Sequence, residues 1–175
     1  TFTAALKVIP FQMQFEVASN TEKIIEVSCQ TFNSTGNFTI DWGDNSTILN
    51  NYTAGTITHT YNAGNSGTTI DPVISFGDTN DTGVLTNVTH TASSRSDLID
   101  VPQWGNMEFS RYSFQDRFVA CNNSSFQISA TDAPNIETPN LNMRRLFRYA
   151  NPAFNSDISH WNADVGNSFE LAFTN

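Results

Sequence analysis

The amino-acid sequence predicts a mainly β protein with short helices, in which a β-sandwich over residues 1–95 precedes a repeat solenoid over residues 96–175. Two observations predict this fold. Short segments of alternating apolar and polar residues, separated by Gly- and Asn-rich turns, fill the first half of the chain. In the second half, aromatic residues recur with a period in the high twenties, which is typical of units that bury their apolar edges by stacking.

Six strands are predicted in the first half. In the first of them, Met13, Phe15 and Val17 alternate with polar residues, as a half-buried strand requires. The other five are expected over residues 23–29, 37–42, 56–61, 69–76 and 84–91, between turn sequences such as NAGNSG and GDTNDTG. Six short strands at this spacing favour a sandwich that ends near residues 92–97.

A short helix is predicted at the start of the repeat. Met143, Leu146, Phe147 and Ala150 have the i, i+3, i+4, i+7 spacing of one helical face. The apolar series then continues through a polar connector at Phe154, Ile158 and Trp161.

The repeat is visible on both sides of this helix. Phe118 precedes Phe147 by one period, and Phe173 follows it by one period. Stacked units place equivalent residues in register, so we expect Phe147 to pack over Phe118. The last unit is incomplete, and we expect further sequence or another chain to cover its apolar residues. The candidates for this interface are Val165, Phe169, Leu171 and Phe173.

The repeat resembles a known family. The run NMRRLFRYANPAFNSDISHWNADVGN is similar to the unit of the BspA-like leucine-rich-repeat surface proteins, approximately NMxxMFxxAxxFNxDISxWxxxxVxN. The matching positions include Met143, Phe147, Phe154, Asp157, Ile158 and Trp161. The resemblance implies a leucine-rich-repeat solenoid and a place on a bacterial cell surface.

The first half carries a second resemblance. FTIDWGDNS at residues 38–46, followed by THTY at residues 58–61, resembles the polycystic-kidney-disease (PKD) type of β-sandwich module. The residues that carry it are Asp41, Trp42, Gly43, Asp44, His59 and Tyr61. It implies a structural role for the segment, in which Asp44 caps a turn. Calcium binding by Asp41 and Asp44 is an alternative, although only two ligands are local and calcium takes about six or more oxygens.

Composition narrows the classes of partner. With 8 Lys+Arg against 17 Asp+Glu, the net charge is −9, which argues against nucleic acid as a partner. The one basic cluster, Arg144, Arg145 and Arg148, is expected on the solvated side of the predicted helix. No apolar run approaches the roughly 20 residues of a membrane span. The chain begins at Thr1, so we expect that a leader has been removed or that a longer protein contains it.

No group of residues predicts catalysis. The three histidines are widely separated, and no metal, nucleotide or nucleophile motif occurs, so we expect neither an enzyme nor a cofactor. Cys29 and Cys121 are expected to be buried free thiols, with a disulfide between them as the alternative. Trp42, Trp104 and Trp161 are expected in the core, with sugar-stacking platforms as the alternative. Eight N-glycosylation sequons leave both chance occurrence and real glycans open.

These observations predict a non-catalytic recognition or adhesion module on the exterior of a bacterial cell or virion. It would act by display, and its partners would be other protein chains or a cell-surface glycan or protein. The alternative function is a structural virion component, such as a phage decoration, fibre or accessory protein, that acts by assembly. A third class, an accessory module of a carbohydrate-active enzyme, would need a catalytic domain that this sequence lacks.

Overall fold

The computed structural model describes residues 9–17, 22–31, 38–46, 49–52, 54–62, 71–78, 85–109, 115–136, 142–161 and 170–174. The strands are β1 (Phe11–Phe15), β2 (Lys23–Thr31), β3 (Phe38–Asp41), β4 (Leu49–Tyr52), β5 (Gly55–Tyr61), β6 (Val73–Asp78), β7 (Leu85–His90), β8 (Leu98–Gln103), β9 (Glu108–Phe109) and β10 (Asn135–Ile136). A 3-10 helix, η1 (Ala92–Ser94), lies between β7 and β8.

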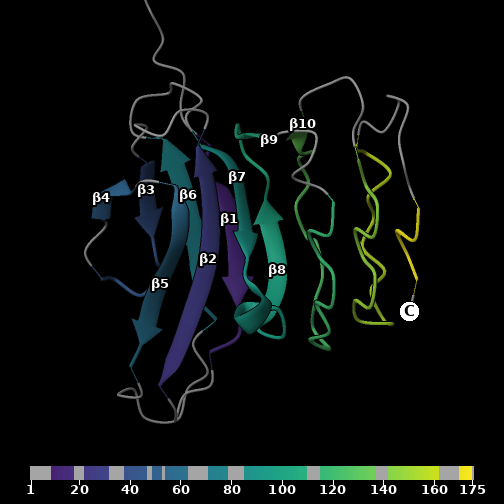
Figure 1. The fold of residues 1–175 in the computed structure, drawn as a ribbon, viewed down its shortest axis with the longest axis horizontal. Coiled ribbons are helices and arrows are strands. Elements are labelled where there is room, and N and C mark those ends of the chain that lie inside the picture. The colour runs from purple at the N-terminus through teal and green to yellow at the C-terminus, as the bar shows by residue number, and fades with distance from the viewer. Residues whose placement is uncertain are drawn as a thin grey trace, which may run out of the picture.

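Two antiparallel sheets contribute to one apolar core (Figure 1). The five-stranded sheet has the order β4-β3-β6-β1-β8, and the three-stranded sheet has the order β5-β2-β7. β9 and β10 form a short parallel pair beside them. The prediction of a mainly β fold is confirmed.

β1 shows why these segments become strands. Phe11, Met13 and Phe15 are buried, whereas Gln12 and Gln14 are partly exposed, so the alternation in the sequence becomes two faces of a strand. Burial of each large apolar side chain favours folding by about 1.5–3 kcal/mol relative to exposure. A slip of one residue in register would move all three to the wrong face, which fixes the pairing of β1 with β6.

The five-stranded sheet extends past the predicted end of the sandwich. β8 pairs antiparallel with β1 and places Leu98 opposite Phe15. β4, β8, β9 and β10 were not among the six predicted strands. The division between residues 95 and 96 stays a prediction, and the sheet crosses it through β8.

Residues 143–150 form consecutive turns, so the prediction of a helix there is wrong. The amides of Leu146, Arg148 and Ala150 each donate to a carbonyl three residues earlier. Arg145 and Tyr149 have φ angles of 56° and 58°, in the left-handed region that interrupts a right-handed helix. In the described part of the chain the only helix is the three-residue η1, and no helix there is long and apolar enough to cross a membrane.

Three such segments lie side by side at one end of the molecule (Figure 1). We call them the first turn (residues 115–121), the second turn (residues 142–150) and the third turn (residues 170–174), and together the stack. Positive φ angles recur at equivalent places, at Asp116 and Ala120 in the first turn and at Leu171 in the third. The backbone conformation of the turns therefore repeats with the same period as the aromatic side chains.

Aromatic rings stack in register along these turns. The ring centroids of Phe118 and Phe147 lie 5.5 Å apart, and those of Phe147 and Phe173 lie 5.3 Å apart. The predicted packing of Phe147 over Phe118 is confirmed. Outside the turns, Phe126 stacks on Phe154 with 5.4 Å between ring centroids, and Trp104, which directly follows β8, meets Trp161 edge-on at 5.2 Å.

Arg117 joins the stack to the sheets. Its side chain is buried and donates to the backbone carbonyl of Val88 in β7. The guanidinium carbon lies 4.5 Å from the centroid of the Phe109 ring and 5.3 Å from that of Phe11. Burial lowers the pKa of Arg117 to about 9. The cation is thus held among ring faces, an arrangement that favours Arg over Lys because the guanidinium is planar.

Candidate functional site

The residues of the DWGDN and HTY segments meet beside β3 and β5. The Trp42 ring stacks on the His59 ring at 4.7 Å, and the Tyr61 hydroxyl donates to the Trp42 carbonyl at 2.7 Å. Gly43 has a φ of 73°, and a Cβ there would lie 2.5 Å from the Val73 carbonyl oxygen. The predicted strand followed by a turn is confirmed, and Trp42 faces the core as expected.

The two carboxylates of this segment bind their own turn. Asp41 Oδ1 accepts from the Gly43 amide at 2.9 Å, and Asp44 Oδ1 accepts from the Ser46 amide at 3.0 Å. Asp44 Oδ2 lies 2.8 Å from His59 Nε2. Burial alone raises the pKa of Asp44, but hydrogen bonds from Ser46 and His59 outweigh it and lower the pKa below its usual value. Across the described residues, no group of three or more His, Cys, Asp or Glu could hold a metal ion.

The structure brings His90 and Cys121 together, a pair that the sequence did not predict. Cys121 Sγ lies 3.1 Å from His90 Nε2, and both side chains are buried. Burial raises the pKa of Cys121 to about 12 and lowers the pKa of His90 to about 4. The sulfur therefore stays a thiol and the imidazole stays neutral, whereas a nucleophilic cysteine needs a thiolate that substrate can reach. Cys29 is also a buried free thiol, so the expectation of two free thiols is confirmed.

The repeat-motif residues occupy structural positions. Met143, Phe147 and Trp161 are buried, and Phe154 and Ile158 pack against the core. Asp157 caps a turn by accepting from the Ser159 amide at 2.9 Å, and hydrogen bonds from Ser159 lower the pKa of Asp157. All three tryptophans are buried, which confirms the core expectation and leaves no exposed indole face for a sugar.

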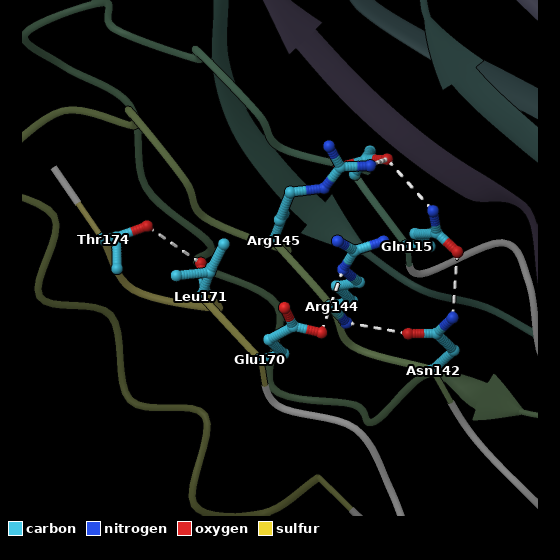
Figure 2. Close-up of polar contacts among 8 residues, drawn as sticks. Gln115, Asn142, Arg144, Arg145, Glu170, Leu171 and Thr174 are labelled. Atoms are coloured by element: carbon cyan, nitrogen blue, oxygen red, sulfur yellow. Dashed lines mark hydrogen bonds and ion pairs between the residues drawn. The ribbon is translucent and has the colours of Figure 1, made fainter.

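The arginine cluster lies on turns and not on the expected helix; its side chains are partly exposed to solvent, and two of them bridge neighbouring turns. Arg145 pairs with Asp116 of the first turn at 2.6 Å, and Arg144 pairs with Glu170 of the third turn at 3.2 Å (Figure 2). Arg148 lies over the Tyr149 ring with its guanidinium carbon 4.5 Å from the centroid. The three cations therefore connect neighbouring units or cover an aromatic ring.

An open hollow of about 610 Å³ lies between residues 124–128, which follow the first turn, and residues 151–156, which follow the second turn. Its lining includes Ser124, Ser125, Gln127, Asn155 and Ser156 and contains no charged side chain. Ser156 Oγ already accepts from the Ile128 amide at 2.7 Å, and the Phe126 ring beneath is buried. The hollow thus offers polar edges without an exposed stacking ring.

The third turn presents the largest apolar exposure among the described residues. Phe173 stacks on Phe147 with one face and is 63% exposed, and Leu171 is 43% exposed. Both were predicted as interface residues; the other two candidates, Val165 and Phe169, lie outside the described residues. Figure 2 shows Leu171 and Thr174 at the outer side of the stack, with Glu170 turned back toward Arg144.

No family model, curated protein or solved structure matches the chain. The chemistry of the described residues must therefore carry any functional conclusion. That chemistry consists of a capped loop, a buried thiol–imidazole pair, a polar hollow and an exposed apolar end of the stack. Of these, the end of the stack is where large apolar side chains, those of Phe173 and Leu171, are exposed to water.

Proposed function

We propose that this chain is a non-catalytic recognition or assembly module that acts by binding another protein chain through the third turn. The observation that carries the proposal is the exposure of Phe173 and Leu171, at 63% and 43%, on a turn whose opposite side repeats the packing of the turns before it. Exposed apolar side chains that continue an internal packing pattern are typical of interaction sites.

The proposal includes the two resemblances of the sequence. A PKD-like module is supported by the contacts of Trp42 with His59 and of Tyr61 with the Trp42 carbonyl, which link the two motif segments. A BspA-like leucine-rich-repeat solenoid is supported by the register of Phe118, Phe147 and Phe173. On this proposal the chain belongs on the exterior of a bacterial cell or virion.

The proposal of a non-catalytic module is supported by the burial of both cysteine thiols. Both cysteines are buried, and burial raises the pKa of each thiol to about 12. The His59 ring stacks on Trp42 and contacts the Asp44 carboxylate, so His59 stabilises the loop that carries these two residues. The two forms of the proposal, adhesion and virion structure, share the protein contact at the third turn and differ in what the partner is.

Photo-cross-linking tests the proposal. Benzoylphenylalanine replaces Phe173 in one variant and Ile24 in a control variant, because Ile24 on β2 is 52% exposed and lies outside the stack. In the cells or particles that produce the chain, we expect a discrete cross-linked protein from position 173 and none from position 24. Equal products at both positions, or none at position 173, would contradict the proposal.

A further inference from the structure

The polar hollow lies between two walls, residues 124–128 and residues 151–156. The first wall pairs through its backbone with β8: the Gln127 amide donates to the Ile99 carbonyl at 2.9 Å, and the Val101 amide donates to the Gln127 carbonyl at 3.3 Å. Across the described residues, no backbone–backbone hydrogen bond joins the first wall to the second. The regular pairing of backbones therefore ends at the first wall.

Side chains take the place of backbone pairing between the two walls. The Asn151 side-chain amide donates to the Ser124 carbonyl at 2.9 Å, and Ser156 Oγ accepts from the Ile128 amide at 2.7 Å. A bridge through a side chain holds two backbones farther apart than direct strand pairing, which sets them about 4.8 Å apart. The hollow follows from this spacing, and all of its lining residues precede the third turn.

Three side chains of the lining leave their polar groups open to solvent. Ser124, Ser125 and Asn155 are exposed, and within the part of the chain that the structure describes their hydroxyl and amide groups have no hydrogen-bond partner. Gln127 is also exposed, and its Nε2 donates to Asp100 Oδ2 at 3.2 Å, which orients this side chain. The hollow thus presents hydroxyl and amide groups, which both donate and accept hydrogen bonds.

The chemistry of the lining disfavours most classes of ligand. No side chain of the lining is charged, so an anion or a metal ion would find no opposite charge there. The large apolar members, Phe126 and Ile128, are buried, so an apolar ligand would gain little contact. An extended peptide would need a strand edge, and neither wall is a strand. A neutral ligand that carries hydroxyl groups fits the lining best.

We propose that the hollow between residues 124–128 and residues 151–156 binds a neutral saccharide, whose hydroxyl groups form hydrogen bonds with Ser124, Ser125 and Asn155. Saccharide hydroxyls donate and accept at once, as the groups of the lining do. The volume of about 610 Å³ lies within the range of about 300–1,000 Å³ for small-molecule sites. This second binding site is separate from the third turn, so it goes beyond the proposed function.

The strength of binding follows from the same lining. Its one aromatic ring, that of Phe126, is buried, so binding depends on hydrogen bonds. Each of these bonds replaces a bond to water and gives only a small net gain in affinity. We therefore expect a Kd of about 1 mM for a short saccharide, which requires a method that detects weak binding.

NMR titration of the full, isotope-labelled chain tests the inference. The probes are the tetrasaccharides of glucose, mannose, galactose and N-acetylglucosamine, each added to about ten times the expected Kd. We expect at least one of them to give saturable shifts of the Asn155 side-chain amide and of the Ser124 and Ser125 backbone amides, with none at Phe173. No saturable shift at the three lining residues with any of these sugars, or equal shifts at Phe173, would overturn the inference.

A double variant, Ser125→Ala with Asn155→Ala, removes two of the open polar groups. Both side chains are exposed, so the fold should be unaffected. We expect the sugar to bind about tenfold more weakly or worse. Asn122→Ala is the matched control, because Asn122 is exposed, directly precedes this region and is not part of the lining. An unchanged affinity in the double variant, or an equal loss in the control, would overturn the inference.

Two further measurements separate the alternatives. A neutral peptide rich in Ser and Asn is titrated in the same way, and shifts with the peptide but with no sugar would assign the hollow to a protein partner and overturn the inference. Phe173→Ala should leave sugar binding unchanged, because Phe173 does not line the hollow. If a sugar binds while cross-linking at position 173 captures no partner, this inference stands and the proposed function fails.

Discussion

The ring of Phe147 stacks on the ring of Phe118 with 5.5 Å between centroids and 10° between planes, although the two residues belong to different units of the repeat. The backbone bonds the same way, because the Phe118 amide donates to the carbonyl of Leu146, the neighbour of Phe147. Ring stacking and backbone pairing thus enforce one register. A unit that lost its ring would lose the contacts on both of its sides.

Phe147→Ala should lower the free energy of unfolding by about 3–5 kcal/mol, because the buried ring leaves a cavity between Phe118 and Phe173. Phe173→Ala is the matched control, because among the described residues the Phe173 ring stacks only on Phe147. This substitution should lower the free energy of unfolding by about 1 kcal/mol or less. Urea denaturation of both variants measures the difference. Similar losses would mean that the third turn is covered in solution.

Protonation of His90 should make the protein less stable in mild acid. Burial lowers the pKa of His90 from 6.5 to about 4. Between these values the unfolded chain binds the proton and the folded chain does not, so stability is present above pH 6.5 and falls as the pH drops toward 4. The loss from this group reaches about 3 kcal/mol.

Denaturation curves between pH 4 and pH 7 check this expectation. His90→Gln should flatten the dependence in that window. Carboxylates with lowered pKa values, such as Asp44, add a further loss at lower pH. A slope that His90→Gln does not alter would mean that other groups titrate there.

The sequence predicted those features that depend on which residues are apolar. Alternation at Met13 and Phe15 predicted β1, and the aromatic period predicted the stacking of Phe118 and Phe147. β4 was missed because its sequence, LNNY, has little apolar character. β8 was missed because Pro102 and the following Trp were assigned to the repeat.

The helix prediction failed for a physical reason. Apolar residues spaced by three and four gather on one side of a helix, but they also gather on one side of consecutive turns. The difference lies in the backbone, where Arg145 and Tyr149 adopt positive φ and alternate amides bond a neighbouring turn. The pattern of apolar residues does not distinguish a helix from consecutive turns of this kind. For the site, Leu171 and Phe173 were predicted, whereas the buried Arg117 was missed because its ring contacts come from distant segments.

Arg117→Lys should lower the free energy of unfolding by about 3 kcal/mol. Lysine keeps the positive charge but loses the planar group that lies over Phe109 and Phe11, and its ammonium is harder to desolvate. Arg148→Lys is the matched control, because Arg148 also lies over a ring, that of Tyr149, in a contact exposed to solvent. We expect its effect to stay within about 0.5 kcal/mol, and equal losses would contradict a special role for Arg117.

Calcium should leave the melting temperature unchanged. The Asp41 and Asp44 carboxylates already accept hydrogen bonds from the amides of Gly43 and Ser46, and Asp44 also faces His59. Asp44→Ala should lower the free energy of unfolding by about 1 kcal/mol with or without calcium, through loss of the turn cap. A melting temperature that rises with calcium in the unaltered chain and not in Asp44→Ala would identify an ion site.

Ala120→Gly should stabilise the protein, which is the opposite of its effect in a helix. Ala120 has a φ of 58°, and the left-handed conformation costs a residue with a Cβ about 1–2 kcal/mol, a cost that glycine does not bear. Greater freedom of glycine in the unfolded chain offsets about 0.4–1 kcal/mol of this gain. Ala153→Gly is the control, because Ala153 is an exposed turn residue outside the positive-φ set, and it should only lose stability. Guanidinium denaturation compares the two variants. A loss of about 1 kcal/mol for Ala120→Gly, as in a helix interior, would mean that the first turn is helical. The amides of Phe118 and Ala120 would then not donate to the carbonyls of the second turn.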